Sequence, residues 1–156
     1  MYNPYDFQKY PKRKSPRLQG YDYSENGYYF VTICTHKKKC IFGKPNDLNE
    51  LGIIVLQGIS KIPEHYPQVV IDKFVVMPNH VHLLIYLKKG NTDLKTVVGS
   101  WKAHITREIR KTEPSLIVWQ KSFHDHIIRN EKGYQNIWLY IESNPTNWEK
   151  DCFYAE

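Results

Sequence analysis

Two apolar runs separated by a short turn constrain the fold of this chain more than any other feature. Residues 69–76 and residues 80–87 are rich in β-branched and aliphatic side chains, and residues 77–79 (MPN) between them are typical of a turn. This pattern predicts an antiparallel β-hairpin. Residues 28–35 (YYFVTICT) are a third dense β-branched and aromatic run, which predicts another buried strand.

Helices are predicted at three places. Apolar residues recur close to every 3.6 positions in residues 48–62, and Pro63 is expected to end that helix. Residues 94–111 repeat the spacing and carry basic residues on the other side, which predicts an amphipathic, basic helix. Residues 132–144 are predicted to form the last helix, and residues 116–119 are a candidate for a short strand.

The predicted order of elements is strand, helix, strand, strand, helix, short strand, helix. An antiparallel sheet with helices packed on one face would give this order. The predicted fold class is therefore α+β, with a ferredoxin-like, split βαβ arrangement. No linker divides the chain, so we expect residues 1–156 to form a single domain.

The charge of the chain favours an anionic partner. It has 22 Lys and Arg against 16 Asp and Glu, which gives a net charge of +6. Nucleic acid is therefore the first partner to test. Residues 1–27 hold three prolines, few aliphatic side chains and a basic cluster, so they are expected to be an arm or a loop.

The cysteines and the hydropathy pattern bear on the compartment. Cys34, Cys40 and Cys152 are odd in number and form no Cys-x-x-Cys pair, so neither a disulfide framework nor a thiolate zinc site is indicated. No apolar run approaches the roughly 20 residues that span a bilayer. We expect a cytoplasmic, nucleoid-associated protein with reduced cysteines and no membrane partner.

Two histidines open the predicted strand at residues 80–87. Because strand side chains alternate, His80 and His82 must point to one face, and Val81 and Leu83 to the other. Both imidazoles can then reach a single divalent ion, provided that the face is open and a third ligand comes from elsewhere. The alternative is a chance pair of hydrogen-bonded histidines, because His-x-His alone is a weak signal.

Tyr140 and Asn144 lie four residues apart on the last predicted helix. Side chains at this spacing project from one helix face about one turn apart. The amide oxygen of Asn144 can complete a site of two imidazoles, and the phenol of Tyr140 stays free. In the alternative, Tyr140 is an ordinary core tyrosine and Asn144 only ends the helix before Pro145.

Four sequence blocks stand out along the chain: residues 30–35 (FVTICT), 76–85 (VMPNHVHLLI), 119–129 (WQKSFHDHIIR) and 140–145 (YIESNP). Together, and in this order, they resemble the signature blocks of the IS200-like transposases, specifically their REP-associated tyrosine transposase branch. The resemblance extends from about residue 12 to residue 145, nearly the whole chain. Members of the wider family carry Gln four residues after the tyrosine, whereas Asn stands here, as in the REP-associated branch.

The resemblance implies a single-domain HUH endonuclease with the HUH motif on a central strand. It implies that His80 and His82 bind Mg²⁺ or Mn²⁺, that Tyr140 is the nucleophile and that Asn144 occupies the place of the third ligand. We expect Mn²⁺ to bind more tightly, because histidine and amide ligands are softer than the oxygen shell that Mg²⁺ prefers. The cut would leave a covalent 5′-phosphotyrosine, and no nucleotide cofactor is needed because the bond energy is retained.

The expected partner is single-stranded, hairpin-forming DNA. Two other readings remain: a module that binds hairpin DNA without cutting it, and a hydrolase in which metal-bound water attacks in place of Tyr140. A monomer is slightly favoured over a homodimer, since the sequence shows neither an obvious pairing strand nor a heptad seam.

DNA binding needs a positive track and aromatic faces. Tyr21 and Tyr23 are candidates for stacking on bases. The segment His124-Asp125-His126 is a possible accessory site for hydrogen bonding, DNA contact or metal binding, and its two histidines share a face if it is extended. The basic candidates for DNA contact are Lys12, Arg13, Lys14, Arg17, Lys37, Lys38, Lys39, Lys95, Lys102, Arg107, Arg110 and Arg129.

Overall fold

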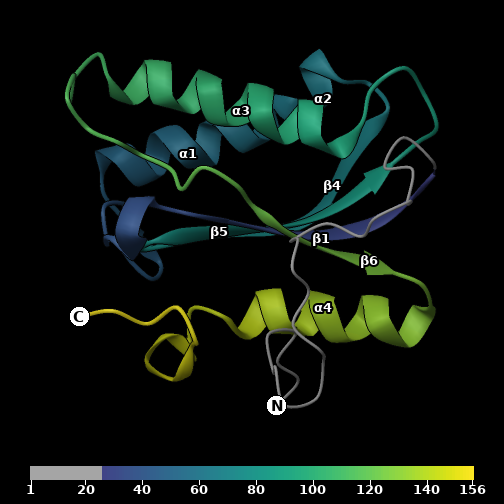
Figure 1. Cartoon of the computed structure of the whole chain (residues 1–156). Coiled ribbons are helices and arrows are strands. Elements are labelled where there is room, and N and C mark those ends of the chain that lie inside the picture. The colour runs from purple at the N-terminus through teal and green to yellow at the C-terminus, as the bar shows by residue number, and fades with distance from the viewer. Residues whose placement is uncertain (1–25) are drawn as a thin grey trace.

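The computed structural model describes residues 26–156 and contains a four-stranded antiparallel sheet (Figure 1). The strand order is β4-β5-β1-β6, and every neighbouring pair is antiparallel. The order is that of a ferredoxin-like sheet, as predicted. The strands are β1 (Gly27–Cys34), β4 (Val69–Met77), β5 (His80–Leu87) and β6 (His124–Ile128).

The helices lie on both faces of the sheet. Figure 1 shows α1 (Glu50–Ser60), α2 (Ile62–His65) and α3 (Leu94–Ile109) over one face, and α4 (Glu131–Ser143) under the other. The expectation that the helices lie on one face therefore holds for the first three and is wrong for α4.

The reason is that the central strands are apolar on both sides. Val31 of β1 and Leu83 of β5 belong to the large core below α1 and α3. The side chains next to them in sequence point the opposite way: Phe30 and Leu84 form a second cluster with Ile137 of α4. A sheet with two apolar faces buries both only when elements cover both.

Local sequence sets the ends of the helices. Asn49, Asp93 and Asn130 cap the N-termini of α1, α3 and α4, and each side chain accepts a hydrogen bond from a backbone N–H three residues on. The predicted helix over residues 48–62 ends at Ser60, and Pro63 lies in the first turn of α2, where a missing N–H costs nothing.

Two strand predictions differ from the structure. Residues 116–119 make only an isolated bridge, between Trp119 and Thr35, and the fourth strand is β6 instead. Two short strands, β2 (Gly43–Lys44) and β3 (Asp47–Leu48), were not expected; they pair with each other outside the main sheet. Gly27 begins β1, so the predicted arm ends before it, and the stacking candidates Tyr21 and Tyr23 lie outside the described residues.

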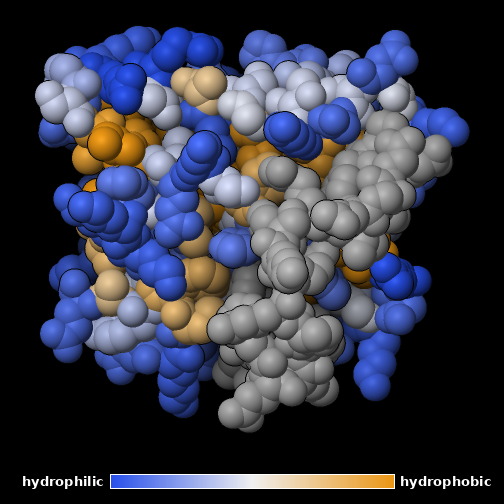
Figure 2. All heavy atoms as spheres, viewed as in Figure 1, coloured by the Kyte–Doolittle hydropathy of each residue, from blue (hydrophilic) through white to orange (hydrophobic). Residues whose placement is uncertain are grey.

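Hydrophilic residues cover much of the face shown in Figure 2, and apolar side chains show between the helical layers. β4 is an edge strand of nine residues, with Val70 and Phe74 exposed. The described residues contain no helix that is long and apolar enough to cross a membrane.

Candidate metal and nucleophile site

The two histidines lie side by side on the central strand β5, on the face that α4 covers. The ring centroids of His80 and His82 are 4.5 Å apart, and both side chains are fully buried. Nδ1 of His80 lies 2.8 Å from Oδ1 of Asn79, and Nδ1 of His82 lies 2.7 Å from Oγ1 of Thr32, its register partner on β1. With Nδ1 engaged in this way, Nε2 is the nitrogen of each ring that is positioned to bind a metal ion.

The structure brings Tyr140 to this pair. Its ring centroid lies 5.4 Å from that of His82 and 5.9 Å from that of Phe30, and the side chain is buried. The amphipathic face of α4 sets this position, because Ile137 and Ile141 pack on the same cluster. The i, i+4 geometry therefore aims the phenol at the sheet face that carries the imidazoles.

Asn144, the C-cap residue of α4, is buried beside the same group. Its Nδ2 donates a hydrogen bond to Oδ2 of Asp151 at 3.0 Å. Its Oδ1 is buried and makes no hydrogen bond within residues 26–156. An amide oxygen of this kind can bind a cation, which fits the role that the family resemblance implies.

Asp151 is a member of the site that sequence reasoning missed. Its Oδ2 lies 3.9 Å from Nε2 of His80, and its side chain is 2% exposed. One ligand atom each from His80, His82 and Asp151 lies within 4.8 Å of the other two. The sequence signal was weak, because a single Asp seven positions after Asn144 does not reveal that the chain folds back.

A C-terminal segment covers the histidines, and we call residues 148–153 the C-terminal cover. The ring centroid of Phe153 lies 4.7 Å from that of His80, and the centroid of Trp148 lies 6.0 Å from it. Nδ2 of Asn79 donates a hydrogen bond to the carbonyl of Phe153 at 2.8 Å. The expectation of an open sheet face is therefore wrong for this form, because aromatic side chains fill the space over the imidazoles.

Burial sets the electrostatics of the site. It lowers the pKa of His80 to about 3, against a smaller opposing effect of the Asn144 amide, and burial also lowers the pKa of His82 well below its usual value. Both rings are therefore neutral near pH 7, the form that binds metals. Burial, followed by the charge of Asp151, raises the pKa of Tyr140, so its phenol is protonated in the closed form.

The accessory segment lies on β6. His124 and His126 pair with Thr32 and Phe30, so they share the face of the histidine pair, as predicted for an extended segment. Asp125 points to the opposite face and is buried. None of the three belongs to the metal-ligating group, which is the one found among the described residues.

The predicted DNA-contact residues lie in different parts of the chain. Lys12, Arg13, Lys14 and Arg17 lie outside the described residues. Lys95, Lys102 and Arg107 lie on α3, which covers the sheet face opposite the histidine pair, and Lys102 donates a hydrogen bond to the carbonyl of Gln120. Arg129 follows β6.

Lys38 is the basic residue that the structure places beside the site. Its Nζ lies 5.3 Å from the centroid of Phe153. Its charge is among the causes that shift the pKa values of His80 and Asp151. Of the basic candidates within the described residues, Lys38 is therefore one whose charge acts on the candidate site.

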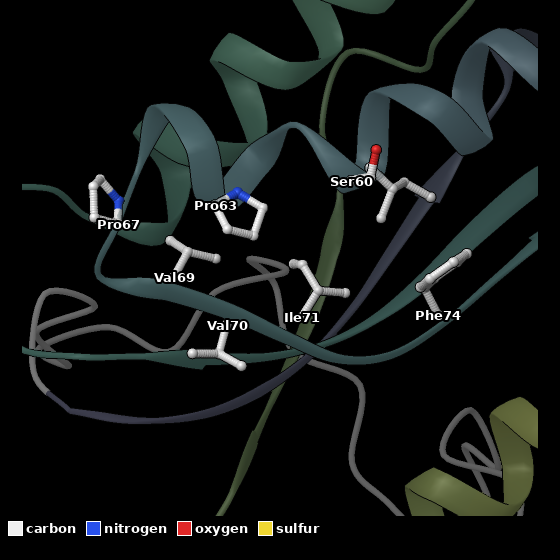
Figure 3. Close-up of a pocket in the computed structure, with 8 residues that line it drawn as sticks. Ser60, Pro63, Pro67, Val69, Val70, Ile71 and Phe74 are labelled. Carbon is white, nitrogen blue, oxygen red and sulfur yellow. The ribbon is translucent and has the colours of Figure 1, made fainter.

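Two other features lack the groups that a catalytic site needs. Tyr134, a second tyrosine on α4, donates a hydrogen bond to Asp72 at 3.0 Å, and burial together with this partner raises its pKa to about 12. A separate hollow between α1, α2 and β4 is lined by apolar side chains such as Pro63 and Phe74, with Ser60 the one polar residue in its lining (Figure 3).

Comparison with known proteins places this geometry in context. The family model described as "Transposase IS200 like" matches residues 22–144. A Haemophilus influenzae protein named only "Uncharacterized protein" is 38% identical over 169 aligned positions, covering 92% of this chain and 94% of that protein. A REP-associated tyrosine transposase of Escherichia coli is 34% identical over 86 positions, covering 51% of this chain and 47% of that one. This chain is also similar to the solved structure of a REP-associated tyrosine transposase bound to a REP hairpin, with a TM-score of 0.67 and 23% sequence identity. The match covers 84% of this chain and 73% of that chain, and it supports the fold.

Proposed function

Because the chain belongs to the IS200-like transposase family, we propose that it is a divalent-metal-dependent endonuclease and strand transferase for single-stranded DNA. In this proposal it acts through a covalent 5′-phosphotyrosine on hairpin-forming repeat DNA. The observation that carries the proposal is the convergence of Tyr140 with the paired imidazoles, 5.4 Å between the rings of Tyr140 and His82. A hairpin partner is supported by the REP hairpin bound to the structural relative.

The residues present suit a divalent cation. His80 and His82 would hold it through Nε2, with Nδ1 of each ring engaged by Asn79 and Thr32. Oδ1 of Asn144, which lacks a hydrogen bond within the described residues, would supply an oxygen ligand. When bound, Mg²⁺ or Mn²⁺ supplies Lewis-acid polarisation of the scissile phosphate.

Tyr140 performs the bond exchange. Its phenolic oxygen attacks phosphorus in line with the departing 3′ oxygen, and the P–O3′ bond breaks. The phenol loses one proton and the departing 3′ oxygen gains one, so the number of protons is unchanged. The phosphodiester energy is kept in the tyrosine ester, so a second 3′-hydroxyl can attack it and restore the phenol. Tyr140 is protonated in the closed form, because burial raises the pKa of its phenol. The phenol must therefore lose its proton once DNA and the cation are bound.

The C-terminal cover must leave the histidines before a phosphate can reach them. His80 and His82 have no exposed surface, and Phe153 and Trp148 stack beside His80. The described form is therefore a closed one, and cleavage requires a second arrangement of residues 148–153.

The test uses a labelled hairpin oligonucleotide incubated with the protein and Mn²⁺. The wild type should form a covalent protein–DNA adduct, and Tyr140→Phe should form none. Tyr134→Phe is the matched control, because it removes another phenol from the same helix, the one that donates a hydrogen bond to Asp72, and it should keep the adduct. An adduct that survives Tyr140→Phe would refute the assignment of the nucleophile, and cutting by that variant at an undiminished rate would favour attack by metal-bound water.

The burial of the site favours one competing function, a module that binds hairpin DNA without cutting it. A permanently closed cover would leave the histidines and Tyr140 as core residues. Tight hairpin binding with no cleavage in any divalent cation would decide for that function.

We also propose that the protein acts as a monomer. The sequence has no heptad seam through which helices of two copies would associate. A dimer mass would overturn this proposal, and the edge strand β4 is where a second copy would then pair. Light scattering on the purified protein, alone and with hairpin DNA, measures the mass that decides this.

A further inference from the structure

We propose that the carboxylate of Asp151 is an additional ligand of the ion held by His80 and His82 when no DNA is bound. This inference rests on the proposed function, because it assumes the metal centre. It adds a residue from outside the signature blocks and links the ion to the C-terminal cover.

The geometry places the carboxylate at the imidazoles. Oδ2 of Asp151 lies 3.9 Å from Nε2 of His80, and the ligand atoms of His80, His82 and Asp151 all lie within 4.8 Å of one another. Two atoms bound to one ion at about 2.0–2.2 Å lie at most about 4.4 Å apart, so Nε2 of His80 and Oδ2 of Asp151 can share an ion at their separation of 3.9 Å. Among the described His, Cys, Asp and Glu residues, these three are the group whose ligand atoms lie within 4.8 Å of one another.

The orientation of the carboxylate is fixed by the chain around it. Oδ1 accepts a hydrogen bond from the backbone N–H of Phe153 at 2.8 Å, and Oδ2 accepts one from Nδ2 of Asn144 at 3.0 Å. Asn144 therefore ties Asp151 to the end of α4, and its own Oδ1 remains available to the same ion. Metal-binding carboxylates are commonly held by hydrogen bonds of this kind.

The burial of Asp151 calls for a compensating charge. Its side chain is 2% exposed and lies in a segment with the aromatic rings of Trp148 and Phe153. Among the described residues, the basic group that lies within 4 Å of its oxygens is the imidazole of His80. Buried carboxylates are normally paired with a cation or coordinate a metal, so a divalent ion between Asp151 and the imidazoles supplies what the protein groups do not.

The position of Asp151 within the cover limits the role to the DNA-free form. When residues 148–153 move aside for DNA, the carboxylate leaves with them, and a phosphate oxygen can take its place on the ion. Asp151 thus stabilises the closed form when metal is present, and its loss affects metal binding more than bond exchange.

The experiment measures Mn²⁺ affinity of the full chain without DNA, by titration calorimetry and by the electron paramagnetic resonance of free Mn²⁺. Asp151→Asn keeps the size and shape of the side chain and should weaken Mn²⁺ binding by at least about tenfold. This is the lower end of the loss in metal affinity seen when a residue that supports a metal ligand is removed. Glu149→Gln is the matched control, because it removes an exposed acid from the same segment and should leave the affinity unchanged.

A second variant separates coordination from folding of the cover. Asp151→Cys replaces a hard oxygen by a soft thiolate, so it should favour Cd²⁺ over Mn²⁺ relative to the wild type, which a purely structural residue would not do. Unchanged Mn²⁺ affinity in Asp151→Asn and unchanged metal preference in Asp151→Cys would overturn the inference, and Asp151 would be a neutral acid that only holds the cover. If the wild type itself binds no Mn²⁺, the metal centre of the proposed function fails instead. Where the wild type does bind Mn²⁺, His80→Ala should abolish the binding, which shows that it takes place at this site.

Discussion

Replacing Phe153 by alanine should loosen the C-terminal cover from the histidine pair. Phe153 is 6% exposed, and its ring contacts His80, His82 and the ammonium group of Lys38. Truncating a buried Phe to Ala costs about 3–5 kcal/mol. We take the lower end, about 3 kcal/mol, because a terminal segment can relax around the gap.

This free energy acts mainly on local opening, because the cover contributes little to the two hydrophobic cores. At 1.4 kcal/mol for each factor of ten, a loss of about 3 kcal/mol raises the equilibrium constant for opening about 100-fold. Amide hydrogen exchange of residues 151–154, measured by mass spectrometry or NMR, should accelerate by that factor. Exchange in β1 and β5 should change far less, since these strands are central in the sheet.

Tyr154→Ala is the control for this experiment. Tyr154 is next in sequence, 42% exposed, and contacts Trp148 rather than the histidines. It should change the exchange of the cover much less than Phe153→Ala. If both variants behave alike, or if Phe153→Ala unfolds the whole chain without first releasing the cover, residues 148–153 are part of the core and the idea of a separable cover is refuted.

Four further predictions concern the support of the site and the packing of the fold. Thr32→Val removes the hydroxyl that lies 2.7 Å from Nδ1 of His82, so Mn²⁺ affinity should fall by about tenfold or more in a calorimetric titration. Unchanged affinity would show that this contact does not orient the ring. Burial lowers the pKa values of His80 and His82, so below the ordinary pKa of 6.5 the unfolded chain binds more protons than the folded one. The free energy of unfolding in urea should therefore fall as the pH drops from 6.5 toward 3. A free energy that does not change over this range would contradict the burial of the two rings. Gly58→Ala places a methyl group 2.3 Å from Cδ1 of Ile105 and should destabilise the fold by about 1–3 kcal/mol. Gly99→Ala, which meets no atom within 4 Å, should stabilise it by up to about 1 kcal/mol in the same denaturation assay.

The sequence predicted the elements whose patterns are local. Alternation along β5 put His80 and His82 on one face, and the i, i+4 spacing aligned Tyr140 with Asn144; both are consequences of helix and strand periodicity. The hairpin of β4 and β5 followed from turn chemistry.

The errors have a common physical cause, which is long-range packing. α4 covers the sheet face that Phe30 and other even-numbered residues of β1 form, because this face is apolar as well as the face formed by the odd-numbered residues. β6 carries charged and imidazole side chains that conceal a strand, and it forms because β1 offers it a free edge. Asp151 lies beside the histidines because the chain folds back after α4. No periodicity in the sequence predicts the path of this irregular segment.

The strand order has a consequence for how such a site can change over evolution. β5 is hydrogen-bonded on both sides, by β4 and β1, so the backbone that carries the imidazoles is held rigidly. Tyr140 and Asp151 come from the last helix and the tail, which belong to no strand of the sheet. They are attached by side-chain packing and by single hydrogen bonds, such as the one from Asn79 to the carbonyl of Phe153. Insertions or deletions after residue 144 can therefore move Asp151 and retune access and turnover in descendants of this chain, and the histidine pair on β5 would be inherited intact.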